Sequence, residues 1–173
     1  MRDADLFAMA LATLAFVPMI AEALRSVASE RTLRAAGASE PERDVYKIMQ
    51  VVYPACFAAM TLEAWTRGTT VASAGWIGGA TFGAAKALKY WAIATLRDRW
   101  TFRVLVPPGS QRVLRGPYRI LRHPNYVAVA GELAGFAAFA GAPVAGVLSF
   151  LVFGALLIAR IRVEERALGL RSR

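Results

Sequence analysis

The chain has 173 residues, of which 57% are apolar, and its mean hydropathy is +0.42. A soluble domain is about 45–50% apolar even when glycine is counted, so the composition argues against a soluble globule of this size. The single cysteine, Cys56, and the single histidine, His123, exclude a disulfide scaffold and a Cys/His zinc site. A net charge of +9 on so apolar a chain is typical of helices anchored beside an anionic membrane face, rather than of nucleic-acid binding.

Five apolar segments are candidates for membrane spans, each of which needs about 20 mostly apolar residues. They are residues 6–24, 48–66, 71–93, 126–140 and 143–161. The fourth is short, but Gly141, Ala142 and Pro143 form a compact turn into the fifth, so these two predict a hairpin. We therefore expect an all-α integral membrane bundle of five transmembrane helices with a C-terminal helical hairpin, in a single domain over residues 1–173.

The basic residues predict one orientation of this bundle, because cytoplasmic loops are enriched in Lys and Arg. With the N-terminus outside, every one of the 21 basic residues except Arg2 and Arg67 falls on the cytoplasmic side. Asp3 and Asp5 give the N-terminal region the wrong charge for a signal peptide, so the first helix is expected to be retained. We therefore expect a multi-pass protein of a bacterial inner membrane, with its active site and C-terminus on the cytoplasmic side.

Small residues recur at helical spacing in the third and fourth segments. They are Gly75, Gly79 and Gly83, then Gly131 and Gly135. In lipid, such stripes let helix backbones approach closely. Packing within one bundle is the favoured interpretation, and a dimer interface is the alternative.

Two polar segments fall on the expected cytoplasmic side, with their motifs at residues 110–126 and 160–168. A hairpin between them brings His123 and Tyr126 close to Arg160 and Glu164, and the last two share a helix face. His123-Pro124 is typical of a helix start, whose free amides could bind a carboxylate. Each feature alone is also explained as a headgroup anchor, a cap or a solvated pair. Together they favour one cytoplasmic pocket.

The motifs themselves resemble those of a known family. They are Gly116-Pro117-Tyr118-Arg119, Arg122-His123-Pro124-Asn125-Tyr126 and Glu164-Glu165-x-x-Leu168. Over roughly residues 87–168 the chain is similar to the isoprenylcysteine carboxyl methyltransferases and their phospholipid methyltransferase relatives. The resemblance implies an integral membrane enzyme that uses S-adenosylmethionine and methylates a lipidic substrate at the cytoplasmic face.

The resemblance also implies roles for individual residues. Cofactor-binding positions are expected at Tyr118, His123, Pro124, Asn125, Tyr126 and Glu164, preceded by the stretch Ser110, Gln111, Arg112 and Val113. Arg160 matches a substrate-contacting arginine of the family, and with Arg122 it is expected to orient an anionic acceptor. The residue types suit the cofactor, because Glu164 can accept from its ammonium or ribose while helix amides and Arg hold its carboxylate.

Glu132 departs from the family pattern, since it lies about two turns inside the fourth segment. An ionisable group at that depth is a functional candidate, although it could equally be a partner for Lys86 or Lys89. If the acceptor is a hydroxyl rather than a carboxylate, a desolvated Glu132 could act as general base. Arg122, Arg160 and Glu132 are therefore the predicted catalytic residues.

The leading function is methyl transfer from S-adenosylmethionine to the carboxylate or hydroxyl of a lipophilic substrate, an isoprenoid or another lipid. The expected partners are that lipophilic or lipidated substrate and membrane lipids, with no nucleic acid and no metal. Three alternatives stay open at this stage. They are a phospholipid N-methyltransferase, which Arg160 and Arg122 argue against, an NADPH-dependent sterol-type reductase and a non-enzymatic membrane assembly subunit.

Overall fold

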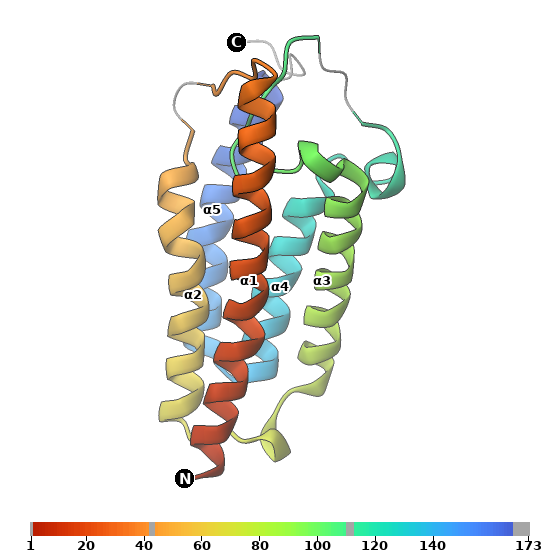
Figure 1. Cartoon of the computed structure of the whole chain (residues 1–173). Coiled ribbons are helices and arrows are strands. Elements are labelled where there is room, and N and C mark those ends of the chain that lie inside the picture. Colours follow the sequence, from red (N-terminus) through yellow and green to blue (C-terminus); the bar gives the residue numbers. More distant parts are fainter. Residues whose placement is uncertain (1, 42–43, 110–112, 168–173) are drawn as a thin grey trace.

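A computed structural model describes residues 2–41, 44–109 and 113–167, and these residues form a bundle of five helices (Figure 1). The helices are α1 (Asp3–Ala35), α2 (Tyr46–Thr66), α3 (Trp76–Leu96), α4 (Pro124–Ala140) and α5 (Pro143–Ala167). Three 3₁₀ turns lie between them: η1 (Val71–Ser73), η2 (Arg97–Arg99) and η3 (Gly116–Arg119). Over the described ranges the only β pairing is the isolated bridge between Ser39 and Val106, so the all-α prediction is confirmed.

The helix ends differ from the predicted segments, and the largest differences are in α1, α3 and α5, the last of which ends at Ala167 rather than at residue 161. α1 continues past residue 24 to Ala35, because the residues that follow the apolar run are polar helix formers rather than helix breakers. The segment predicted to begin at residue 71 starts with η1 and a bend, and its helix begins only at Trp76. Within the described residues, α1 and α5 are long and apolar enough to cross a membrane.

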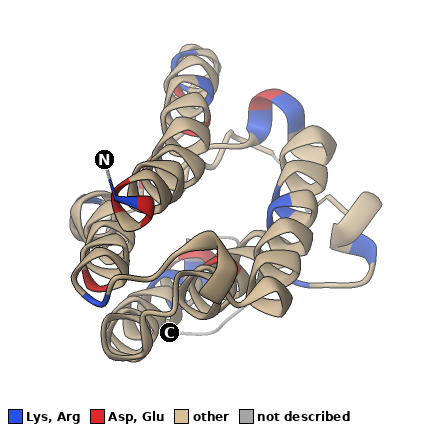
Figure 2. Ribbon diagram, turned by 90° about the horizontal axis from the view of Figure 1, so that it is seen from below, with Lys and Arg blue, Asp and Glu red and all other residues tan. Residues whose placement is uncertain are grey.

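α4 occupies the centre of the bundle and packs against α2, α3 and α5. Its Phe136 is fully buried, with its ring centroid 4.9 Å from that of Phe57 on α2 and 5.7 Å from that of Phe82 on α3. Viewed along the bundle, the helices stand side by side (Figure 2), with the buried core residues between them. Aromatic packing of this kind fixes the position of α4, which carries the predicted site residues Pro124, Asn125, Tyr126 and Glu132.

The hairpin predicted at the C-terminal end is present. α4 ends at Ala140 and is capped by Gly141, which adopts the left-handed conformation with φ 64°, and α5 begins at Pro143. Glycine reaches this conformation without the strain that a side chain imposes. The Glu63 carboxylate of α2 accepts from the Val144 and Ala145 amides at 3.2 and 2.6 Å, which satisfies the free N–H groups at the start of α5.

Glycines allow α3 and α4 to approach closely. A Cβ atom added to Gly135 would lie 2.5 Å from the Phe82 amide nitrogen, and one added to Gly75 would lie 2.3 Å from the Ala138 carbonyl oxygen. Packing within one bundle therefore accounts for this part of the small-residue stripe. Gly83 is different, because an added Cβ would meet nothing within 4 Å.

Gly135→Ala is expected to lower the free energy of unfolding by about 1–3 kcal/mol, because α3 and α4 must separate to admit the methyl group. Gly83→Ala is the matched control, and it should be neutral or slightly stabilising because alanine favours the helix by about 0.5–1 kcal/mol. Thermal unfolding of the two variants in detergent checks this. Equal melting temperatures would contradict the close packing of α3 on α4.

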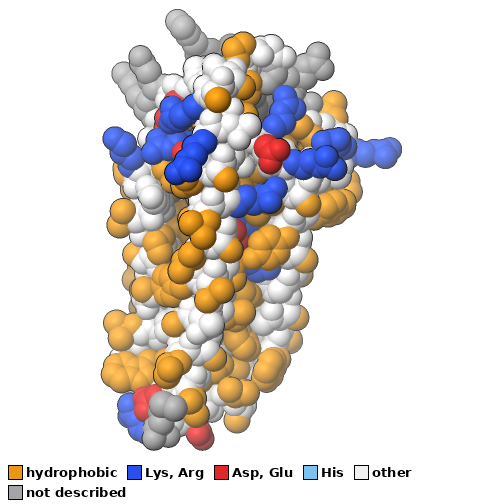
Figure 3. All heavy atoms as spheres, in the orientation of Figure 1, with side chains coloured by type: hydrophobic (Ala, Val, Ile, Leu, Met, Phe, Trp, Pro, Cys, Tyr) orange, Lys and Arg blue, Asp and Glu red, His pale blue; other side chains and the backbone are white. Residues whose placement is uncertain are grey.

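Charged side chains are unevenly distributed over the bundle. On the face seen in Figure 3, most Lys and Arg side chains gather near the end where α1 finishes, and apolar side chains cover the helices below. The exposed apolar residues include Val17, Ile20, Val51, Val147 and Leu151. A large apolar belt below a basic rim is typical of a protein set in a bilayer.

Candidate active site

The first part of the motif forms η3, beside the end of α3. Gly116 has φ 57°, and an added Cβ would lie 2.4 Å from the Thr95 hydroxyl oxygen, so this position requires glycine. The turn buries Pro117 and directs Tyr118 into a cavity. Burial, with a smaller contribution from the charge of Glu164, raises the pKa of Tyr118 far above its usual value, so its phenol stays protonated at neutral pH.

The second part of the motif begins α4 as predicted. His123 is the residue before the first helical turn, and Pro124 occupies the first helical position. The ring of His123 stacks on that of Tyr126 with centroids 5.6 Å apart. Both rings then face the C-terminal part of α5.

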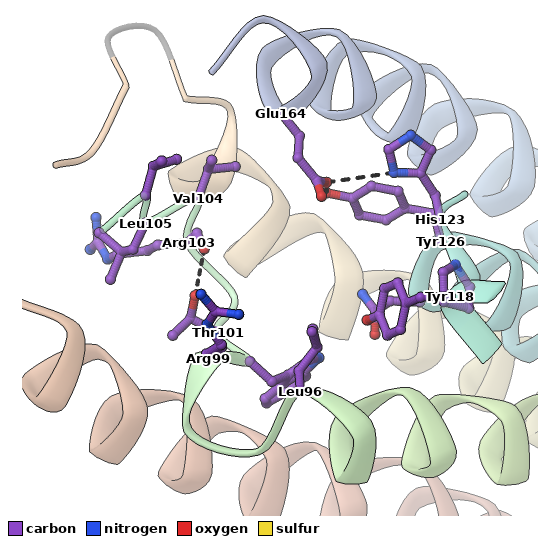
Figure 4. A pocket seen from close by; sticks show the side chains of 14 residues that line it. Leu96, Arg99, Thr101, Arg103, Val104, Leu105, Tyr118, His123, Tyr126 and Glu164 are labelled. Carbon is purple, nitrogen blue, oxygen red and sulfur yellow. Dashed lines mark hydrogen bonds and ion pairs between the residues drawn. The ribbon is translucent and has the colours of Figure 1, made fainter. Parts of the chain in front are cut away.

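Two adjacent carboxylates of α5 hold the start of α4. The Tyr126 hydroxyl donates to Glu164 Oε2 at 2.6 Å, and His123 Nδ1 lies 3.8 Å from the same oxygen. Glu165 Oε1 lies 3.3 Å from both His123 Nε2 and Arg122 Nη1. The predicted meeting of His123 and Tyr126 with the α5 motif is therefore confirmed, and Figure 4 shows these side chains pointing toward Glu164.

One side of a cavity of about 130 Å³, called here the polar cavity because charged and polar side chains line part of it, is formed by Tyr118, His123, Pro124, Asn125, Tyr126 and Glu164. The opposite side is the loop after α3, which sequence reasoning did not identify as part of the site (Figure 4). Residues of this loop and of the adjoining turns that line the cavity are Leu96, Arg99, Trp100, Thr101, Arg103, Val104, Leu105 and Val106. The cavity thus lies between residues separated by up to about 70 positions in the sequence.

Ion pairs fix this loop to the C-terminal end of α1 and the segment that follows it. Arg103 lies 3.2 Å from Glu30 and 2.6 Å from Glu40, and Glu40 also pairs with Arg34 at 2.6 Å. Partial burial opposes ionisation of Glu40, but hydrogen bonds from the two arginines hold its pKa below the usual value. The bridge between Ser39 and Val106 attaches the far end of the loop.

A second, larger cavity of about 360 Å³ extends from this site into the apolar part of the bundle. Its apolar lining comes mainly from α1, α2 and α5, and includes Phe16, Met19, Ile20, Met49, Phe153 and Leu157. Thr101, Asn125 and Tyr126 line both cavities. A polar pocket therefore meets an apolar one at three residues, two of which belong to the predicted motif.

The two arginines predicted to orient the methyl acceptor, Arg160 and Arg122, lie in different surroundings. Arg160 is buried, lines the apolar cavity, pairs with Asp44 and donates to the Phe102 carbonyl. Arg122 is exposed over 62% of its side chain and lines neither cavity. Its role in orienting the acceptor stays a prediction, as does that of Arg160.

Glu132 lies farther along α4 than the motif residues, is fully buried and lines neither cavity. Its Oε2 atom lies 3.2 Å from Lys86 Nζ and 3.4 Å from Lys89 Nζ, and accepts from the Tyr53 hydroxyl. The pairing with both lysines is the alternative considered from the sequence, and a role as general base stays a prediction. Ser110, Gln111 and Arg112 lie outside the described residues, and Val113 is in the loop before η3 without lining either cavity.

The polar cavity suits a ligand that carries both charged and flat groups. Glu164 presents a carboxylate, Trp100 and Tyr118 present aromatic surface, and Asn125 Oδ1 is buried with no hydrogen-bond partner in the described part of the chain. An unpartnered buried acceptor is costly unless a ligand or water donates to it. S-adenosylmethionine has amino and hydroxyl donors together with a planar adenine, so the residues present fit this cofactor.

Comparison with known proteins agrees with the motif. The sequence model of the isoprenylcysteine carboxyl methyltransferase family matches residues 79–169. An uncharacterized Bacillus subtilis protein, YpbQ, is 37% identical over 98 residues, which cover 56% of this chain and 58% of YpbQ. An uncharacterized Haemophilus influenzae protein is 26% identical over 144 residues, or 83% of this chain and 84% of that protein. No solved structure matches the chain.

Proposed function

Because the chain belongs to the isoprenylcysteine carboxyl methyltransferase family of membrane methyltransferases, we propose that it transfers the methyl group of S-adenosylmethionine to an oxygen of a lipophilic molecule. The acceptor oxygen belongs to a carboxylate or a hydroxyl. The observation that carries the proposal is the meeting of the two cavities at Thr101, Asn125 and Tyr126. One cavity suits a polar cofactor and the other suits an apolar acceptor, so their junction is where a methyl group would pass between them.

The cofactor would be held by the motif residues around the polar cavity. Glu164 accepts from the ammonium or ribose groups, and Asn125 Oδ1 supplies a further buried acceptor. Tyr118 and Trp100 offer aromatic surface to the adenine. When bound, the cofactor supplies an electrophilic methyl group on a sulfonium.

The acceptor would lie in the apolar cavity with its reactive oxygen beside Asn125 and Tyr126. Arg160 lines this cavity and can hold an anionic oxygen by a charge-assisted hydrogen bond. A carboxylate needs no general base, so the main contribution of the protein is to place the oxygen in line with the methyl group, and such placement is worth several kcal/mol. A cationic arginine in the cavity wall disfavours the amine acceptor of a phospholipid N-methyltransferase.

The bundle would cross the membrane with all five helices and with the polar cavity on the cytoplasmic side. The apolar belt supports this arrangement, as does the basic rim at the cavity end. A lipophilic acceptor could then enter the apolar cavity directly from the bilayer.

Calorimetry of the full chain in detergent tests the cofactor. S-adenosylhomocysteine is expected to bind one site per chain, and labelled methyl from S-adenosylmethionine should enter the lipid extract of membranes that contain the protein. Binding of NADPH instead would select a reductase. Binding of neither cofactor would support a non-enzymatic assembly subunit.

A further inference from the structure

Five polar residues from four helices meet in the interior, below the site described above, and are called here the inner cluster: Glu22, Tyr53, Lys86, Lys89 and Glu132. Lys86 Nζ lies 3.0 Å from Glu22, and Lys89 Nζ lies 2.6 Å from Glu22. Both ammonium groups also pair with Glu132, to which Tyr53 donates. The two lysines and two glutamates balance in charge.

Burying such a cluster of charges inside the bundle costs free energy. Each charge must leave water, and a buried ion pair is often no more stable than well-packed apolar residues of similar size. Ionisable residues within membrane helices commonly face a cavity and mark a functional site. Packing alone therefore does not explain why four helices each contribute a polar group here.

The cluster is also part of the wall of the apolar cavity. Tyr53 and Lys89 line that cavity, although every neighbouring lining residue of α1 and most of those of α5 are apolar. Two hydrogen-bonding residues of the inner cluster thus line the cavity beside its apolar residues, in addition to Gln50, Asn125 and Arg160. Lys89 already pairs with Glu22 and Glu132, so a polar group of a ligand would join a formed network.

The charge balance indicates which polar group fits. An anionic group would add an uncompensated negative charge beside Glu22 and Glu132, and a cationic group would add a positive charge beside Lys86 and Lys89. Glu132 Oε1 is buried without a hydrogen-bond partner among the described residues, but Glu132 does not line the cavity, so Tyr53 and Lys89 are the cluster residues that a ligand can reach. A neutral hydroxyl adds no charge, and it can accept from Lys89 and donate to the Tyr53 hydroxyl oxygen.

We propose that the inner cluster binds a hydroxyl group of the acceptor, distinct from the oxygen that is methylated. This inference rests on the proposed function, because it places the methylated oxygen at the junction of the two cavities. Glu132 follows Tyr126 by six residues on α4, which corresponds to about 9 Å of helix rise. The acceptor is therefore a lipid with two oxygen functions separated by about this distance, the second one deeper in the bilayer.

Positional isomers of dodecanediol test the spacing, since an extended alkyl chain spans this distance between its first and eighth carbons. The 1,8 isomer should bind the detergent-solubilised protein about tenfold more tightly than the 1,4 isomer or 1-dodecanol, as measured by competition with a fluorescent fatty alcohol. Tyr53→Phe keeps the ring but removes the hydroxyl that orients Glu132, and it should reduce this preference to about twofold or less.

Val51→Ala is the matched control on α2, because Val51 is exposed and lines neither cavity. It should keep the full preference. Equal affinities for all isomers in the unmodified protein would overturn the proposal, as would an unchanged preference in Tyr53→Phe or no binding of any isomer. Calorimetry with S-adenosylhomocysteine in the same preparations separates this failure from failure of the proposed function, because cofactor binding does not depend on the inner cluster.

Discussion

Glu164→Ala is expected to weaken the binding of S-adenosylhomocysteine about 100-fold. The carboxylate lines the polar cavity and accepts from the Tyr126 hydroxyl at 2.6 Å, so under the proposed function it would contact the cofactor and also fix a second cavity residue. Hydrogen bonds to a charged group are worth about 1.5–3 kcal/mol, and 1.4 kcal/mol corresponds to a factor of ten in affinity. Removal of the side chain affects both contacts, which places the loss near the upper end of this range.

The neighbouring carboxylate supplies the control for this experiment. Glu165 pairs with Arg122 and His123 but does not line the cavity, so Glu165→Gln should change the dissociation constant about threefold or less. Calorimetric titration of both variants in the same detergent measures the difference. Similar losses in the two variants would mean that the α5 motif acts by holding α4 in place, and not by contacting the cofactor.

Local sequence signals predicted the parts of the site that depend on neighbouring residues. Pro124 after His123 indicated the start of α4, and Gly141 before Pro143 indicated the turn of the hairpin. Once the hairpin is known, antiparallel geometry alone brings Tyr126 to Glu164. This half of the site could be predicted because each step of the inference spans only a few residues or one tight turn.

The other wall of the polar cavity could not be predicted from local sequence signals. The loop that carries Thr101 and Arg103 has no regular structure of its own, and its position depends on Glu30 and Glu40 some sixty to seventy residues earlier. Asp44, the partner of Arg160, precedes it by more than a hundred residues. No hydrophobic period or turn motif encodes such long-range pairs.

The inner cluster could be predicted from the sequence only in part. Glu132 and its possible partners Lys86 and Lys89 stood out in the sequence, because charges within apolar segments are rare. Glu22 carried the same signal near the end of the first apolar segment, but the sequence alone did not connect it with α3. Tyr53 carried none, since a tyrosine in a membrane helix is ordinary. Its contact with Glu132 is visible only when α2 and α4 are placed side by side.

Glu132→Leu is expected to destabilise the folded protein by about 3–5 kcal/mol, because it leaves two lysines facing the single carboxylate of Glu22 inside the bundle. For a chain of this size, each kcal/mol lowers the melting temperature by about 2–4 °C, so a decrease of about 10 °C follows. Thermal unfolding in detergent, followed by circular dichroism at a fixed scan rate, measures it.

The charge-balanced double variant Lys86→Met with Glu132→Leu separates charge from volume. It keeps the 2.6 Å pair between Lys89 and Glu22, removes one charge of each sign, and should recover at least half of the lost melting temperature. A double variant as unstable as Glu132→Leu would show that packing around residue 132, not the balance of charge, determines stability there. Recovery leaves a folded protein without the Glu132 carboxylate, and its turnover on carboxylate and hydroxyl acceptors then tests that group as a general base.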